Sequence, residues 1–198
     1  MGSCTCRLIR QAGGRSVLDL TLISIVVGLG LTELLLTFYR LIQARRRVTW
    51  DPLPLAWALL ILVAVVNYWW GIRASMAGAS GLTTGEFMLV MISPIFIFLT
   101  CAAALPRVEA AGPIDMKAAY ADERTAFLLF FLAYGLGNWT LSLSGLIPSP
   151  VPAVLISRTM VSIALVAALI ARSRRWDWVA LAVIAGAYAL RLVTQLVK

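Results

Sequence analysis

The sequence predicts an all-α fold, a polytopic transmembrane bundle of about six spans arranged as three hairpins. Two properties of the chain predict this class. Of its 198 residues, 61% are apolar and only 13% are charged, about half the roughly 25% of charged residues that a soluble domain carries. The apolar residues also gather in long runs, and a helix needs roughly 20 such residues to cross a bilayer. One membrane domain accounts for this length of chain.

Six apolar runs define the predicted spans. The runs are continuous rather than alternating and exceed the roughly 9–11 residues of a barrel strand, so we expect helices. Residues 1–16 are predicted to be a mobile tail, and residues 17–198 a single transmembrane domain. The predicted spans are 17–41, 54–72, 87–105, 125–143, 151–171 and 178–197.

Basic residues are divided unequally between the two ends of this predicted bundle. Ten belong to the first, third and fifth connections: Arg40, Arg45, Arg46, Arg47, Arg107, Lys117, Arg124, Arg172, Arg174 and Arg175. Six belong to the other end: Arg7, Arg10, Arg15, Arg73, Arg191 and Lys198. Because cytoplasmic loops hold the excess of Lys and Arg, we expect these three connections in the cytoplasm and both termini outside.

Two of the charged turns have similar sequences. Trp50-Asp51 precedes the second predicted span, and Trp176-Asp177 precedes the sixth. A tryptophan suits the membrane interface, and an aspartate can accept hydrogen bonds from the first N–H groups of a helix. We therefore predict Asp51 and Asp177 as helix caps. An old duplication of a hairpin or convergence on one cytoplasmic turn would each explain the likeness.

The sequence does not contain the residues that several classes of catalysis and cofactor binding require. The chain has no histidine, which excludes imidazole-ligated metals and Ser-His catalysis. Cys4 and Cys6 are one residue apart rather than in a Cys-x-x-Cys pair. Both lysines lie outside the predicted spans, so no retinal-type Schiff base is expected. We predict no catalytic residue, no cofactor and no metal ligand, and we consider an enzyme the least favoured function.

Glu33 is the polar residue that says most about function, because it lies inside the first predicted span. A carboxylate at that depth costs several kcal/mol unless it is protonated, paired or hydrated. Arg158 in the fifth span is its predicted partner. The pair, with Thr32, Asn67 and Asn138, forms our candidate polar site in the membrane. One interpretation is a proton or cation site; the other is a structural link between helices.

Three local patterns complete the prediction. Pro94 should kink or interrupt the third span. Residues 114–127 have an amphipathic pattern, which predicts a short interfacial helix leading into the fourth span. Gly28-Leu29-Gly30 and Gly135-Leu136-Gly137 repeat one motif, and small residues of this kind allow helices to approach closely.

Several segments of the chain resemble those of a group of small bacterial inner-membrane proteins. These segments are Gly28 to Leu36, Tyr39-Arg40-Leu41, Trp50 to Trp57, Tyr68-Trp69-Trp70 and the spacing of Asp115, Tyr120, Arg124 and Phe127. The resemblance covers about the first two thirds of the chain. It implies a bacterial cytoplasmic membrane and six spans, and it implies no activity.

These observations favour a small transporter or channel-like protein with its polar site at Glu33. The alternative is a scaffold or accessory subunit whose buried polar residues are structural, and a membrane-embedded enzyme comes third. The net charge of +8 is gathered next to the spans, so we expect anionic membrane lipids as partners and no nucleic acid. A homo-oligomer or a second membrane protein is a further expected partner.

Overall fold

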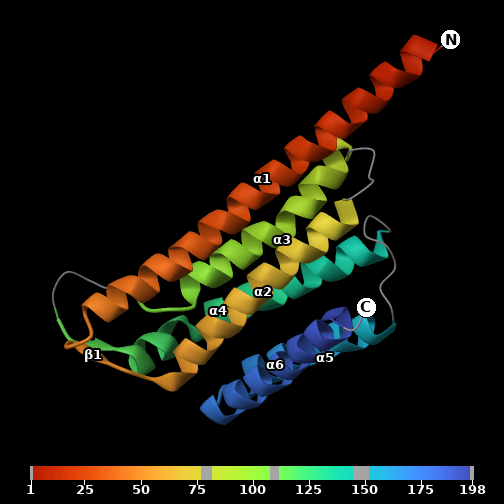
Figure 1. Cartoon of the computed structure of the whole chain (residues 1–198). Helices are drawn as coiled ribbons and strands as arrows, with labels where there is room; N and C mark the ends of the chain where they lie inside the picture. Colours follow the sequence, from red (N-terminus) through yellow and green to blue (C-terminus); the bar gives the residue numbers. More distant parts are fainter. Residues whose placement is uncertain (1, 77–81, 108–111, 145–151, 197–198) are drawn as a thin grey trace.

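The computed structural model describes residues 2–76, 82–107, 112–144 and 152–196, and these fold into six helices and one short strand pair (Figure 1). The predicted helical class is therefore confirmed, with one addition, the two strands of two residues each. In chain order the elements are α1 (Gly2–Gln43), β1 (Val48–Thr49), α2 (Pro52–Met76), α3 (Thr84–Ala103), β2 (Ile114–Asp115), α4 (Met116–Leu143), α5 (Pro152–Ala171) and α6 (Arg174–Leu196).

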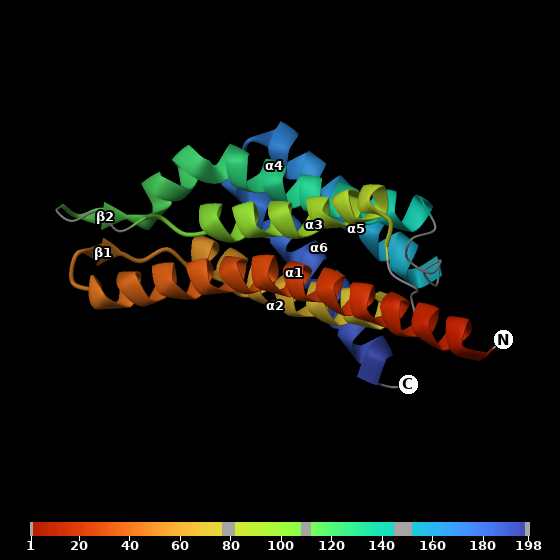
Figure 2. The same ribbon diagram turned by 90° about the horizontal axis from the view of Figure 1, so that it is seen from above.

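The helices form a ring. Each odd-numbered helix packs against the next one in the chain, as expected for three hairpins, and further contacts close the circle in the order α1, α3, α4, α5, α6, α2. Helix α2 also contacts α3 and α4 across this circle. Both termini lie at one end of the bundle, and the N-terminal part of α1 projects beyond its neighbours (Figures 1 and 2). The strands lie at the other end, where β1 and β2 pair in parallel.

Four of these helices, among the residues described, are long and apolar enough to cross a membrane. They include the segments Leu18–Gln43, Pro52–Ser75, Thr84–Ala103 and Met116–Leu143. In α5 the apolar segment Leu155–Ala171 is shorter than these four among the residues whose side chains the structure describes. Many large apolar side chains also point outward, for example Leu18, which is 65% exposed, and Leu59, which is 64% exposed. Such a surface is compatible with an integral membrane protein and costly in water.

Two predicted boundaries differ from the structure. The first helix begins at Gly2, so residues 1–16, which we predicted as a tail, are helical from Gly2 onward. The fourth helix begins at Met116, nine residues before the predicted span. Asp115 explains this start, because its Oδ1 accepts hydrogen bonds from the N–H groups of Lys117 at 2.9 Å and Ala118 at 3.3 Å. The predicted interfacial helix and the span are thus one continuous helix.

Helix α3 packs closely against both of its neighbours. A Cβ atom added to Gly30 of α1 would lie 3.2 Å from the Cα of Phe98, and one added to Gly137 of α4 would lie 2.8 Å from the Oγ of Ser93. Each Gly-Leu-Gly motif therefore places its second glycine against α3. The helix itself continues through Pro94, so this proline does not interrupt it.

Candidate functional site

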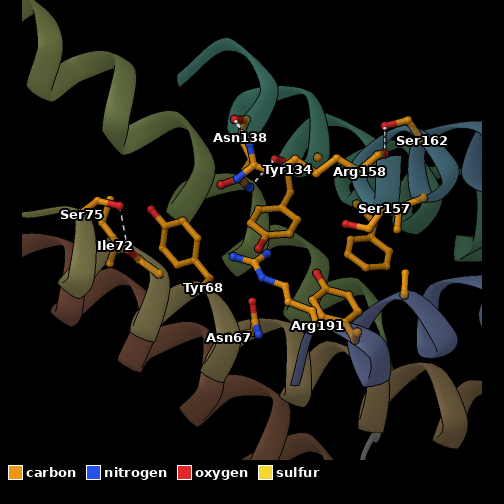
Figure 3. Close-up of a pocket in the computed structure, with 16 residues that line it drawn as sticks. Asn67, Tyr68, Ile72, Ser75, Tyr134, Asn138, Ser157, Arg158, Ser162 and Arg191 are labelled. Carbon is orange, nitrogen blue, oxygen red and sulfur yellow. Dashed lines mark hydrogen bonds between the residues drawn. The ribbon is translucent and has the colours of Figure 1, made fainter. Parts of the chain in front are cut away.

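A pocket opens among α2, α4, α5 and α6 (Figure 3). Its residues lie near the end of the bundle that carries the termini (Figure 1). Its volume is about 120 Å³. A single water needs about 10–15 Å³ by this kind of measure, so the cavity has room for several waters or a small ligand. Each helix contributes residues spaced three or four apart, as one face of a helix requires. The polar and charged lining residues are Asn67, Tyr68, Ser75, Tyr134, Asn138, Ser157, Arg158, Ser162, Tyr188 and Arg191.

Arg158 extends from α5 toward α4 (Figure 3). Its Nη1 donates a hydrogen bond of 3.2 Å to the backbone oxygen of Asn138 and a second one to the Oγ of Ser142. The side chain of Asn138 donates in turn to the backbone oxygen of Tyr134 at 2.9 Å. The end of α4 thus holds the Arg158 guanidinium at the wall of the pocket.

Arg191 enters the pocket from α6. Figure 3 shows its guanidinium close to Tyr134 and Asn67, with Tyr68 to one side. A Cβ atom added to Gly71 of α2 would lie 3.8 Å from its Nη2, so the guanidinium extends across to α2. Arg191 and Arg158 are close enough for their charges to repel. Two cations therefore face one cavity.

Tyrosine rings line the inner wall. The rings of Tyr68 and Tyr134 meet edge to face, with centroids 5.9 Å apart, and the hydroxyl groups of Tyr134 and Tyr188 interact. The Tyr68 side chain is buried, and its hydroxyl has no hydrogen-bond partner among the described residues. A buried hydroxyl without a partner costs free energy, which makes this oxygen available to a ligand.

The pocket has an excess of positive charge. Its lining includes two arginines and, among the residues that the structure describes, no aspartate or glutamate. Arginine remains charged and offers five N–H donors, and the tyrosines and serines add hydroxyl groups. This set of side chains can bind an anion. It offers no metal site, and nowhere in the described ranges do three His, Cys, Asp or Glu side chains gather to form one.

An aromatic layer closes the pocket on its inner side. Phe131 lines the cavity and stacks on Tyr134 at 6.1 Å, and Trp57 contacts Phe131 and Phe127 at 6.2 Å and 5.3 Å between ring centroids. Trp57 is fully buried, and each phenylalanine is 1% exposed. This layer separates the pocket from the charged end of the bundle.

A buried ion pair lies beyond the aromatic layer. The Nε and Nη2 of Arg124 in α4 donate to the two carboxylate oxygens of Asp177 in α6, at 2.8 Å and 2.6 Å. The same Nη2 also donates to the backbone oxygen of Ala168 in α5 at 2.6 Å. The Asp177 side chain is 1% exposed and that of Arg124 is 12% exposed. One arginine thus links three helices.

Asp51 and Asp177, the two predicted caps, have different roles in the structure. The Oδ1 of Asp51 accepts a hydrogen bond of 3.1 Å from the Leu53 N–H at the start of α2. It also pairs with Arg174 of α6. Asp177, by contrast, lies inside the first turn of α6, which begins at Arg174. The prediction of a second cap is corrected, because the Asp177 carboxylate is held by Arg124 instead.

We expect Asp51 to stabilise the fold less as the pH falls. Burial acts to raise the pKa of its carboxyl. Arg174 and the Leu53 N–H lower this pKa by more than burial raises it, so the pKa lies below its usual value. A lowered pKa stabilises the fold above the unfolded-state pKa, about 3.9, and this stabilisation is lost as pH falls through the folded-state pKa. Denaturation curves from pH 6 to pH 3 should therefore be steeper in pH for the wild type than for Asp51→Asn. Equal slopes would contradict this role.

The predicted polar site is only partly assembled. Arg158, Asn67 and Asn138 meet in the pocket, whereas Glu33 and Thr32 lie on α1, which packs on α2 and α3. The predicted Glu33–Arg158 pair is absent, because α5 packs on α4 and α6 instead. Glu33 is half-buried and forms no hydrogen bond or ion pair with another residue in the described part of the chain. The hydroxyl of Thr32 donates to the Gly28 oxygen of its own helix at 2.8 Å.

Sequence reasoning missed Arg191 and the three tyrosines. We assigned Arg191 to a helix end, where a basic residue has an ordinary explanation. A signal was present in the spacing, because Tyr188 and Arg191 share a helical face, as do Tyr134 and Asn138. Which of these faces meet depends on how the helices are arranged.

The chain matches no protein-family model, no curated protein and no solved structure.

Proposed function

We propose that the chain is a six-span protein of a bacterial inner membrane that binds a small anion in the pocket and transports it. The four long apolar helices support membrane location. The other two helices are α5, with 20 residues, and α6, with 23 residues. Their lengths are about 30 and 34 Å at 1.5 Å per residue. A hydrocarbon core is about 30 Å thick, so both helices are long enough to span it.

The proposed topology places the strand end in the cytoplasm and the pocket toward the outside. It rests on the unequal division of basic residues. In a background without native cysteines, we expect a membrane-impermeant thiol reagent to label Ser144→Cys in intact cells. Arg46→Cys should be labelled only after the cells are permeabilised. The opposite pattern would reverse the topology and place the pocket toward the cytoplasm.

The observation that carries the functional proposal is that two arginines, Arg158 and Arg191, line the same pocket. Charges inside a membrane protein mark ligand or ion pathways when they face a cavity. An anion would relieve the repulsion between Arg158 and Arg191 and accept hydrogen bonds from both. The proposal therefore moves the functional site from Glu33 to the pocket.

Binding should depend on both arginines. We expect Arg158→Gln and Arg191→Gln each to weaken binding of the anion by about 10- to 100-fold, because a hydrogen bond to a charged group contributes about 1.5–3 kcal/mol. Purified protein would be titrated with chloride, acetate and inorganic phosphate. The matched control is Arg73→Gln, since Arg73 is exposed over the Trp70 ring and lies outside the pocket.

Two outcomes would contradict parts of this proposal. If both pocket variants bind every anion as the wild type does, the pocket is not the site. If the wild type binds an anion but proteoliposomes show no flux, the binding proposal stands and transport is rejected. Glu33→Gln should leave binding unchanged, because Glu33 lies outside the pocket.

A further inference from the structure

We propose that the anion bound in the pocket is an organic anion with an apolar body about the size of one ring. This inference rests on the proposed anion-binding function and specifies the class of ligand. It comes from the way in which the lining changes along the pocket. Charged side chains lie toward the helix ends, whereas aromatic and apolar side chains lie deeper in the bundle.

The charged part of the pocket lies near the ends of its helices. Arg158 is six residues from the start of α5 at Pro152, and Arg191 is five residues from the end of α6 at Leu196. At 1.5 Å per residue these separations are about 9 and 7.5 Å. Both helix ends lie on the side of the bundle that carries the termini (Figure 1). The anionic group of a ligand is therefore expected on this side.

The deeper part of the pocket is apolar. Phe131 lies 12 residues before the end of α4 at Leu143, about 18 Å, and its ring stacks on that of Tyr134. Val161 lies about one turn deeper than Arg158 on the same face of α5. Apolar surface of a ligand that is removed from water against these side chains favours binding. An inorganic anion has no such surface, so this part of the lining points to an organic anion.

The size of the cavity matches a body of one ring. Its volume is about 120 Å³, and an engineered apolar cavity of about 150 Å³ binds benzene. Tyr68 and Tyr134 present aromatic rings to the same space (Figure 3), and aromatic rings pack favourably edge to face or offset. A ring-sized body would therefore occupy most of the cavity, with its charged group directed toward the arginines.

Tyr68 lies between the two parts of the pocket. It is eight residues from the end of α2 at Met76, about 12 Å, a depth between those of the arginines and Phe131. Its side chain is buried, and its hydroxyl has no hydrogen-bond partner among the described residues. The Tyr134 hydroxyl differs, because it interacts with that of Tyr188. An oxygen of the anionic group would accept a hydrogen bond from the Tyr68 hydroxyl and satisfy this donor.

The test compares ligands that differ in one part only. Protein in phosphatidylcholine nanodiscs would be titrated with acetate, benzoate and benzamide by isothermal titration calorimetry. Acetate has the carboxylate without the ring, and benzamide has the ring and nearly the same shape without the charge. Empty nanodiscs measure the uptake of each probe by the lipid.

We expect benzoate to bind at least about tenfold more tightly than acetate, because its ring buries more apolar surface in the pocket. It should also bind at least about tenfold more tightly than benzamide, because hydrogen bonds to a charged group are stronger. Val161→Thr replaces one methyl group with a hydroxyl at the apolar part of the lining. This variant should weaken benzoate binding by about threefold to fourfold and leave acetate binding unchanged.

Tyr68→Phe deletes one oxygen and should weaken benzoate binding by about tenfold, the effect of losing a hydrogen bond to a charged group. The melting temperature without ligand should stay unchanged or rise, because the variant removes a buried hydroxyl that has no partner in the described part of the chain. The matched control is Tyr39→Phe, since Tyr39 is 57% exposed on α1 and lies outside the pocket. It should bind benzoate as the wild type does.

The outcomes separate the inference from the proposed function. If acetate, chloride or phosphate binds as tightly as benzoate, the inference is overturned and anion binding stands. If benzamide binds as tightly as benzoate, the pocket does not select an anion, and both are overturned. Both are also overturned if no anion binds. If Tyr68→Phe binds benzoate as the wild type does, or lowers the melting temperature without ligand, the role given to the Tyr68 hydroxyl is overturned.

Discussion

Replacing Arg124 with alanine should lower the free energy of unfolding by about 3–5 kcal/mol, the usual effect of breaking a buried ion pair by removing one partner. The reason is that Asp177, which is 1% exposed, would be left as a buried carboxylate with its charge unbalanced. The Ala168 carbonyl would also lose its side-chain donor. Unfolding in mixed micelles with increasing denaturing detergent would measure the change.

Two further variants make this prediction specific. Arg175→Ala is the control, because Arg175 is an exposed arginine in the first turn of α6, the turn that holds Asp177, and its loss should change stability by less than about 0.5 kcal/mol. The double variant Arg124→Met with Asp177→Leu should recover much of the loss, since apolar residues of similar volume often replace a buried pair without cost. A double variant as unstable as Arg124→Ala would show that the charges are not the cause.

Gly30→Leu should destabilise the bundle by about 1–3 kcal/mol, the usual cost of overpacking a close contact. Even the first added carbon would lie 3.2 Å from the Phe98 Cα. That atom belongs to the backbone, so α1 and α3 would have to separate. Thermal unfolding of the purified protein, followed by the loss of helical circular dichroism, would report the change.

The same helix offers a matched control for this prediction. Gly28 has no atom within 4 Å of an added Cβ, so Gly28→Leu introduces the same side chain into open space. It should be neutral, or stabilise by up to about 1 kcal/mol, because glycine is a poor helix former. Equal destabilisation by both variants would contradict close packing at Gly30.

The helices could be predicted from the sequence because each depends on local composition. Apolar runs predicted four of the six helices to within four residues at both ends, whereas α1 and α4 begin earlier than predicted. The early start of α4 follows from Asp115, a local cap. The arrangement of the helices could not be predicted in this way. Periodicity shows which residues share a face, but not which faces meet across the bundle.

The candidate site shows this limit most clearly. Glu33 and Arg158 both lie inside predicted spans, and pairing them would have reduced two burial costs. The ring order places α1 and α5 apart, however, and brings Arg191 of α6 to Arg158 instead. Arg124 was assigned to a charged loop because its ion-pair partner could not be recognised from the sequence. Its partner Asp177 is 53 residues away in the sequence, and no local pattern connects the two.

The links at the strand end also bear on the order in which the chain can be completed during synthesis. The Arg47 backbone oxygen accepts a hydrogen bond from the Ile114 N–H at 2.8 Å. The connection between α1 and α2 therefore gains this hydrogen bond only after the connection between α3 and α4 has been synthesised. Asp51 gains its ion pair later still, because its partner Arg174 follows it by 123 residues. The ribosome has therefore synthesised α1 to α5 before α6 supplies Arg174 and Asp177, the partners of Asp51 and Arg124. Until then, both charges depend on water or lipid headgroups at the membrane surface.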